Sequence, residues 1–182
     1  AHPSAWVLLG RIKHWSGDAV ASADAYHRAL GQIGEADDAV RASALSCLGA
    51  LLAHGDRYSE AIDVLDEAIA VCHQIGAFRP LLRALFFDGL ARANQGDLAG
   101  ALTTFETKGT LLDRYGVPFY RARTNTCLAW IWREVGDLGR AAPRAVALEA
   151  RERRAVHVLH ARGQARARDL AVRVAAGPDL EP

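Results

Sequence analysis

Asp88 and Arg92 are the residues whose types and spacing come nearest to acid–base chemistry in this sequence. They stand four residues apart, so on a helix a carboxylate general base could meet its anchoring cation. The same spacing is typical of an ion pair on a helix surface, worth about 0.3 to 0.5 kcal/mol, and we favour that interpretation. No motif supplies a nucleophile or a metal set that would converge on the pair.

Histidines and cysteines are the candidate metal ligands. His14 and His54 occupy corresponding places in two similar stretches of sequence, but a histidine pair with no third ligand nearby usually lines a polar surface. The cysteines at 47, 72 and 127 have neither CxxC nor Cys/His ligand spacing, and they are too few for a secreted disulfide framework. Neither a Walker sequence nor a GxGxxG loop occurs. We therefore predict no metal, no cofactor and no enzymatic activity.

Composition describes a folded globular protein. The 182 residues suffice for one domain with a sizeable core, and 51% are apolar against 24% charged. The net charge of +1 provides no overall attraction to nucleic acid or to an anionic membrane. No apolar run approaches the roughly 20 residues of a membrane span, and no signal pattern precedes the first helix. We expect a cytoplasmic protein and, because no Met occurs even at position 1, a piece of a longer chain.

A repeat of about 40 residues organises the chain. Gly-Asp pairs begin at residues 17, 55, 96 and 136, and a second glycine series falls between them at 34, 76 and 116. Between the glycines the apolar residues follow the helical period, as at Ala61, Leu65, Ala68 and Ile69, and strand alternation is absent. Each Gly-Asp pair predicts a turn in which glycine closes one helix in the left-handed conformation and Asp caps the next.

Small residues recur where the two helices of each predicted hairpin would cross. They are Gly10, Gly49, Gly89 and Ala129 in the first helices and Ser22, Ala61, Ala101 and Ala141 in the second. Small side chains let helix axes approach to the low end of the usual 8 to 10 Å range. Large side chains follow the second series by four residues, at Tyr26, Leu65 and Phe105. The pattern predicts eight helices in four antiparallel hairpins.

This alternation of large and small positions resembles the tetratricopeptide repeat (TPR) family over roughly residues 5–151. Trp6, Leu9, Gly10, Tyr26 and Ala29 carry the match in the first unit, and the second unit repeats it at Leu45, Leu48, Gly49, Leu52, Ala61, Leu65 and Ala68. The resemblance implies an all-α solenoid with units at about 5–34, 42–76, 82–116 and 122–151, a C-terminal capping helix at 152–176 and a tail at 177–182.

Four residues depart from the family pattern. Asp88 stands at a usually apolar position, Lys108 at a usually small one, and Arg92 replaces a large apolar side chain. Pro143 falls inside the second helix of the fourth unit, so we expect that helix to begin near residues 140 to 142 or to be kinked.

The period of 40 rather than 34 residues resembles the long-repeat TPR regions of bacterial LuxR-type and other ATP-dependent transcriptional regulators. That resemblance implies a non-enzymatic sensor or scaffold with flanking domains in the same chain. Residues 140–182 contain nine Arg and five acidic residues, which leaves a nucleic-acid contact as an alternative. We favour a solvated cap face and do not expect nucleic acid to be a partner of this segment.

In the TPR family the first helices of the hairpins line the concave face. Carried over position by position, the resemblance implies a ligand groove whose main residues are Arg11, His14, Trp15, His54, Arg83, Phe86, Phe87, Asn94, Arg123, Trp130 and Arg133. Val7, Leu8, Ser46, Cys47, Ala50, Leu90 and Thr126 lie beside them. Aromatic and Arg side chains are the types enriched at binding hot spots, so we expect a protein or peptide partner, or a small effector. An enzyme would instead need a closed pocket with strongly perturbed titratable groups.

Overall fold

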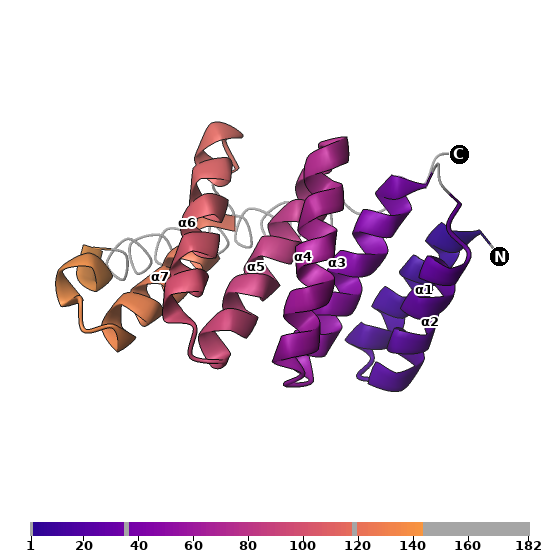
Figure 1. Ribbon diagram of the computed structural model, residues 1–182, viewed down its shortest axis with the longest axis horizontal. Coiled ribbons are helices and arrows are strands. Elements are labelled where there is room, and N and C mark those ends of the chain that lie inside the picture. Colours follow the sequence, from indigo (N-terminus) through magenta and orange to yellow (C-terminus); the bar gives the residue numbers. More distant parts are fainter. Residues whose placement is uncertain (1, 35–36, 118–119, 144–182) are drawn as a thin grey trace, which may run out of the picture.

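The computed structural model describes residues 2–34, 37–117 and 120–143 (Figure 1). Within these ranges every regular element is helical, and the all-α prediction is confirmed. Seven helices have both ends described: α1 Pro3–Trp15, α2 Ala19–Gly31, α3 Asp38–His54, α4 Tyr58–Ile75, α5 Phe78–Asn94, α6 Leu98–Arg114 and α7 Arg121–Glu134. The predicted cap at 152–176 and the tail at 177–182 lie outside the described residues.

The helices form successive antiparallel hairpins along the long axis of the molecule (Figure 1). The first helices of neighbouring hairpins contact one another, α1 with α3, α3 with α5 and α5 with α7. In the described part of the chain α2, α4 and α6 make no contacts with each other. The array therefore curves with the first helices on its inner side, which is the arrangement of an α-solenoid.

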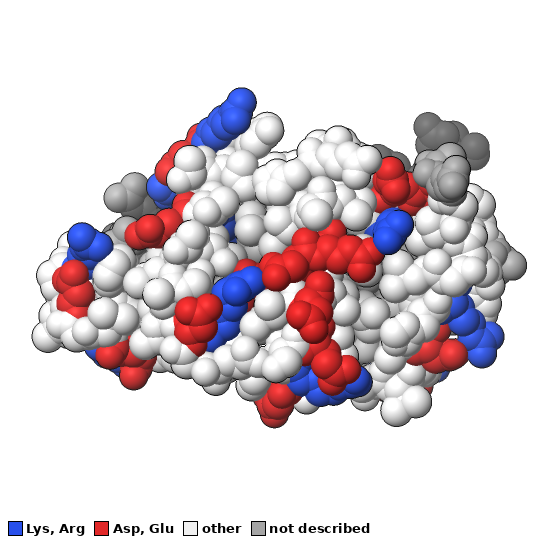
Figure 2. Space-filling view, viewed as in Figure 1, with Lys and Arg blue, Asp and Glu red and all other residues white. Residues whose placement is uncertain are grey.

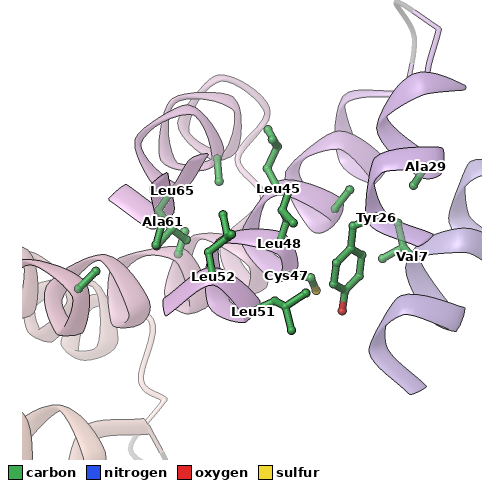
Figure 3. Packing of buried hydrophobic residues seen from close by; sticks show 14 residues of the cluster. Val7, Tyr26, Ala29, Leu45, Cys47, Leu48, Leu51, Leu52, Ala61 and Leu65 are labelled. Carbon is green, nitrogen blue, oxygen red and sulfur yellow. The ribbon is translucent and has the colours of Figure 1, made fainter. Parts of the chain in front are cut away.

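Each of the first three hairpins is held at a crossing of glycine against a large side chain. A Cβ atom added to Gly10 would lie 2.5 Å from the Tyr26 ring, and one added to Gly49 would lie 2.4 Å from Leu65 Cγ. Gly89 has the same relation to Phe105 in the third hairpin, at 2.7 Å. Figure 3 shows Tyr26 and Leu65 among the buried side chains of the first core cluster. The glycines therefore allow the two helices of a hairpin to approach closely with a large side chain packed between them, as the spacing predicts.

Three of the four predicted Gly-Asp turns have the expected geometry. Gly17, Gly96 and Gly136 have φ angles of +82°, +87° and +85°, the left-handed region that glycine enters at low cost. The second turn differs, because Asp56 has the positive φ, at +59°, while Gly55 stands at −94°. The left-handed positions 17, 56, 96 and 136 are more evenly spaced than the Gly-Asp pairs, so the second pair is out of register by one residue.

The fourth hairpin begins its second helix earlier than predicted. Residues 138–143 are helical, so the expected start near residues 140 to 142 is wrong. Asp137 fixes the earlier start because its Oδ1 accepts a hydrogen bond from the backbone N–H of Arg140 at 3.0 Å. Any kink caused by Pro143 would fall beyond the described residues.

Asp88 is buried and Arg92 is partly buried, which corrects the prediction of a surface ion pair. Asp88 is 2% exposed, and its two oxygens each accept from Arg92 Nε at 2.9 Å. Thr104 of α6 donates to the same carboxylate at 2.8 Å, and Arg92 Nη2 reaches Asp66 of α4 at 3.0 Å. Asp88 and Arg92, which both replace apolar residues of the family pattern, therefore pair with each other. Together they connect α5 to α4 and α6 through hydrogen bonds.

Lys108 is the third departure, and it is buried without a carboxylate. The residue is 2% exposed, and Nζ lies 4.3 Å from the centroid of the Phe86 ring. Burial, together with the nearby charge of Arg123, lowers the pKa of Lys108 to about 8. The Arg123 guanidinium also lies over the Phe86 ring, at 4.0 Å. Phe86 is therefore a core residue that supports two cations.

Candidate ligand groove on the inner helices

One pocket of about 470 Å³ opens on the inner side of the solenoid. Its lining comes from the four first helices and from one residue of α2: Arg11, His14, Trp15, Tyr26, Cys47, Ala50, His54, Arg83, Phe87 and Arg123. Seven of the eleven predicted groove residues are in this set. Apart from the adjacent His14 and Trp15, lining residues on the same helix stand three, four or seven residues apart, so the helical period places them on one face.

The other four predicted groove residues do not line the pocket. Phe86 is 5% exposed and packs against Phe105, with ring centroids 6.0 Å apart. Trp130 is half-buried against the second core cluster, around α5 to α7. Asn94 donates to the carbonyl of Leu90, and Arg133 pairs with the neighbouring Glu134. Asn94 and Arg133 are exposed close to the ends of α5 and α7.

Tyr26 is the pocket residue that the sequence did not indicate, since it belongs to a second helix. Its ring packs on Gly10, so the absence of a side chain there lets the ring reach the inner side. The sequence feature that could have predicted this position is the pairing of Gly10 with Tyr26 at the helix crossing. The Tyr26 hydroxyl is buried near Ser22 and Cys47 and makes no hydrogen bond of normal geometry with a described residue, and burial raises the pKa of Tyr26.

The pocket is electropositive. Among the described residues, Arg11, Arg83 and Arg123 line it, no Asp or Glu does, and none of the three contacts a carboxylate. Arg83 Nη1 instead donates to Cys47 Sγ at 2.8 Å and to Ser46 Oγ at 3.4 Å. Such unpaired guanidinium groups around a hollow favour an anionic ligand.

The outer side has the opposite charge. Exposed acidic residues follow one another along α4 at positions 60, 63, 66 and 67. Figure 2 shows acidic side chains gathered over α4, on the side of the second helices. The described residues therefore place a strip of acidic side chains along α4 on the outer side and three cations around the inner pocket.

His14 and His54 meet inside the pocket. His14 Nε2 and His54 Nδ1 are 3.1 Å apart, so one ring donates to the other and the acceptor nitrogen must be unprotonated. The rings cross edge to face, and His54 makes the same kind of contact with Phe87, with centroids 5.0 Å apart. Burial, and secondarily the nearby His54, lower the pKa of His14. In the described ranges no group of three or more His, Cys, Asp or Glu residues could hold a metal ion.

Comparison with solved structures gives the architecture a family context. Aspartyl phosphate phosphatase F from Bacillus subtilis superposes with a TM-score of 0.75 over 82% of this chain, at 14% sequence identity. A Podospora anserina kinesin light chain protein with nearly identical TPR-like repeats superposes with a TM-score of 0.69 over 85% of this chain, also at 14% identity. The fold is TPR-like.

The likeness concerns the fold alone. This TPR-like array spans 40% of the length of the phosphatase and 78% of that of the kinesin light chain protein. No protein-family model and no curated protein matches its sequence. Among the described helices of the array, none is long and apolar enough to cross a membrane.

A second hollow of about 520 Å³ lies between the first two hairpins of the TPR-like array. Its charged lining residues include Arg41 and Glu67, which already pair with each other at 2.5 Å. Its cation is therefore neutralised within the protein. The inner pocket retains three cations with no acidic partner, and it is the better candidate for a ligand.

Proposed function

We propose that this TPR-like array is a non-enzymatic scaffold that binds an acidic segment of a partner protein in the inner pocket. The observation that carries the proposal is the set of Arg11, Arg83 and Arg123 around the pocket, with no carboxylate among the lining residues that the structure describes. A partner that supplies Asp or Glu side chains would provide the missing charge.

The aromatic side chains of the pocket add an apolar component. Trp15 is 88% exposed, and Phe87 lies in the lining with one edge against His54. Burying one aromatic or aliphatic anchor of the partner against them supplies about 1.5 to 3 kcal/mol. The preferred segment is therefore one apolar residue flanked by acidic residues.

A binding experiment with matched peptides tests the proposal. The probe is a short peptide with one Phe between Glu residues, and its control carries Gln in place of each Glu. We expect the Glu peptide alone to bind, and Arg83→Gln with Arg123→Gln to weaken it at least about tenfold, because each charge-assisted contact is worth more than a neutral one. Calorimetry measures both affinities.

Arg133→Gln is the matched control variant, since Arg133 is exposed, pairs with Glu134 and lies outside the pocket. It should leave the affinity unchanged. Equal binding of the Glu and Gln peptides, or equal weakening by the Arg133 variant and the pocket variant, would refute the acidic-segment proposal.

The regulatory context is a separate proposal. We infer that the array is the sensor or scaffold portion of a larger bacterial, cytoplasmic transcriptional regulator with further domains in the same chain. The support is the repeat of about 40 residues, which resembles the long TPR repeats of LuxR-type regulators. Sequencing the complete gene tests this, since an ATPase or a DNA-binding domain is expected beside the array.

A further inference from the structure

Cys47 lines the inner pocket and contacts both Arg83 and Tyr26. It lines the pocket from α3, it is 4% exposed, and its Sγ accepts a hydrogen bond from Arg83 Nη1 at 2.8 Å. Figure 3 shows the Tyr26 ring beside Cys47, with the hydroxyl on the side of the sulfur atom. A thiol next to a guanidinium group at the edge of a cavity has the surroundings of a reactive cysteine.

The hydrogen bonding around this thiol is incomplete. Tyr26 is 0% exposed, and its hydroxyl lies near Ser22 and Cys47 but makes no hydrogen bond of normal geometry with a described residue, although buried hydroxyl groups are normally paired. Arg83 has only a sulfur atom and the distant Ser46 hydroxyl as acceptors. An oxygen atom bonded to the Cys47 sulfur would offer both donors a strong acceptor.

We propose that hydroperoxides oxidise Cys47 to the sulfenic acid, and that Arg83 and Tyr26 hold the oxygen of the product. The Cys47 thiolate attacks one peroxide oxygen, the S–O bond forms as the O–O bond breaks, and the other oxygen leaves as hydroxide or alkoxide and takes up a proton. The sulfur loses two electrons and the peroxide gains them.

The remaining cysteines provide an internal comparison. Burial raises the pKa of Cys72 to about 11, and burial also raises the pKa of Cys127. Neither of them lines the inner pocket. Because the thiolate is the reacting form, both should react more slowly with peroxide.

The oxidation has a consequence that rests on the proposed function. A sulfenate oxygen on Cys47 would occupy Arg83, which we assign to the acidic segment of the partner. Oxidised protein should therefore bind the Glu peptide less tightly. The oxidation itself is measured without any partner, so its failure and the failure of the proposed function are distinguishable.

The test uses the full chain, hydrogen peroxide and dimedone as a trap for sulfenic acid, with mass spectrometry of the peptides that contain each cysteine. We expect the dimedone adduct to form on Cys47 about ten times faster than on Cys72 or Cys127. In denaturant the three rates should agree within about threefold. Equal rates for Cys47 and another cysteine in the folded protein would overturn the proposal.

Two variants test the supporting residues. Arg83→Gln should slow adduct formation about tenfold, while Arg133→Gln should leave the rate unchanged. Tyr26→Phe keeps the ring on Gly10, so the thiol should be consumed at the normal rate but with less adduct and more sulfinic acid. Identical behaviour of the two Arg variants would refute the role of Arg83. If circular dichroism shows that a variant is unfolded, the comparison among the wild-type cysteines still decides.

Discussion

Lys108 is a cation that the fold buries against an aromatic ring. Its folded pKa of about 8 lies below the ordinary value of 10.5, so between these pH values the unfolded chain binds more protons than the folded one. Stability contributed by this group therefore rises as pH climbs from about 8 to 10.5. The shift corresponds to about 3 kcal/mol against the charged form.

Replacing Lys108 with Met should stabilise the protein at pH 7 by about 1 to 3 kcal/mol, because it removes the buried charge and conserves side-chain length. Urea unfolding at pH 7, 8.5 and 10 measures the difference, which we expect to narrow as the wild-type lysine loses its proton. Lys13→Met is the control, since Lys13 is exposed beside Asp18. A stabilisation that stays constant with pH would contradict this explanation.

The His14–His54 hydrogen bond predicts pH-dependent binding. The other charged groups that the structure describes in the pocket are Arg11, Arg83 and Arg123, so no acidic group in this lining favours protonation of His14. A bound acidic ligand would favour protonation of His14, and the protonated ring would add positive charge to the pocket. We expect affinity for the Glu peptide to rise about three- to tenfold from pH 7.5 to 5.5.

His14→Gln with His54→Gln should remove this pH dependence. His73→Gln, on the last turn of α4 and outside the pocket, should retain it. Calorimetry across the pH range supplies the affinities. A wild-type affinity that is flat with pH would show that the two rings do not gain protons when the peptide binds.

At the scale of helices, the crossings depend on glycine only where a neighbour touches it. A Cβ atom on Gly49 would lie 2.4 Å from Leu65 Cγ, whereas one on Gly109 of α6 would have no neighbour within 4 Å. Gly49→Ala should therefore destabilise by about 1 to 3 kcal/mol through overpacking. Gly109→Ala should stabilise by roughly 0.5 to 1 kcal/mol, because alanine is the better helix former.

Thermal unfolding of the two variants measures these opposite shifts. They differ by the same methyl group in helices of one protein, so the comparison isolates the crossing. A neutral result for Gly49→Ala would mean that α3 and α4 can separate at little cost.

The sequence predicts the helices well because one period controls both packing and turns. Glycines 10, 49 and 89 recur opposite Tyr26, Leu65 and Phe105, and steric fit requires small against large at each crossing. The left-handed residue of the second turn was predicted at Gly55, because Gly55 and Asp56 form a Gly-Asp pair, but the structure has it one residue later, at Asp56. Asp tolerates the left-handed conformation, so the repeat geometry prevailed over the glycine signal.

The pocket was only partly predictable, for a geometric reason. Adjacent helical residues differ by about 100° in direction, so Phe87 faces the pocket while Phe86 faces the core. The repeat pattern assigned both rings to the same face. Likewise Asp88 and Arg92 have the spacing of a surface ion pair, and only the packing of α4 and α6 on α5 buries Asp88 and partly covers Arg92.

For the whole molecule, the uneven distribution of charge suggests two alternative partners, an acidic protein segment at the inner pocket and a nucleic acid at the Arg-rich C-terminal end. Replacing Arg153, Arg154, Arg166 and Arg168 with Gln removes positive charge from the Arg-rich end of the chain, and all four residues lie outside the described part. Affinity for the Glu peptide should stay within about twofold if, as the sequence predicts, these residues form a solvated cap face, because solvated surface charges contribute little. Loss of nucleic-acid retention at physiological salt would instead favour the nucleic-acid alternative.

The pocket also has a mechanical consequence, because its lining includes Arg11 on α1 and Arg123 on α7. A solenoid whose hairpins touch only their neighbours can wind or unwind like a spring, with small rotations that accumulate along its length. A ligand bound by both arginines would connect the first hairpin to the fourth and hold the distance between them fixed. Occupancy should therefore stiffen the array, so that a pull applied to its ends meets greater resistance with ligand bound than without it.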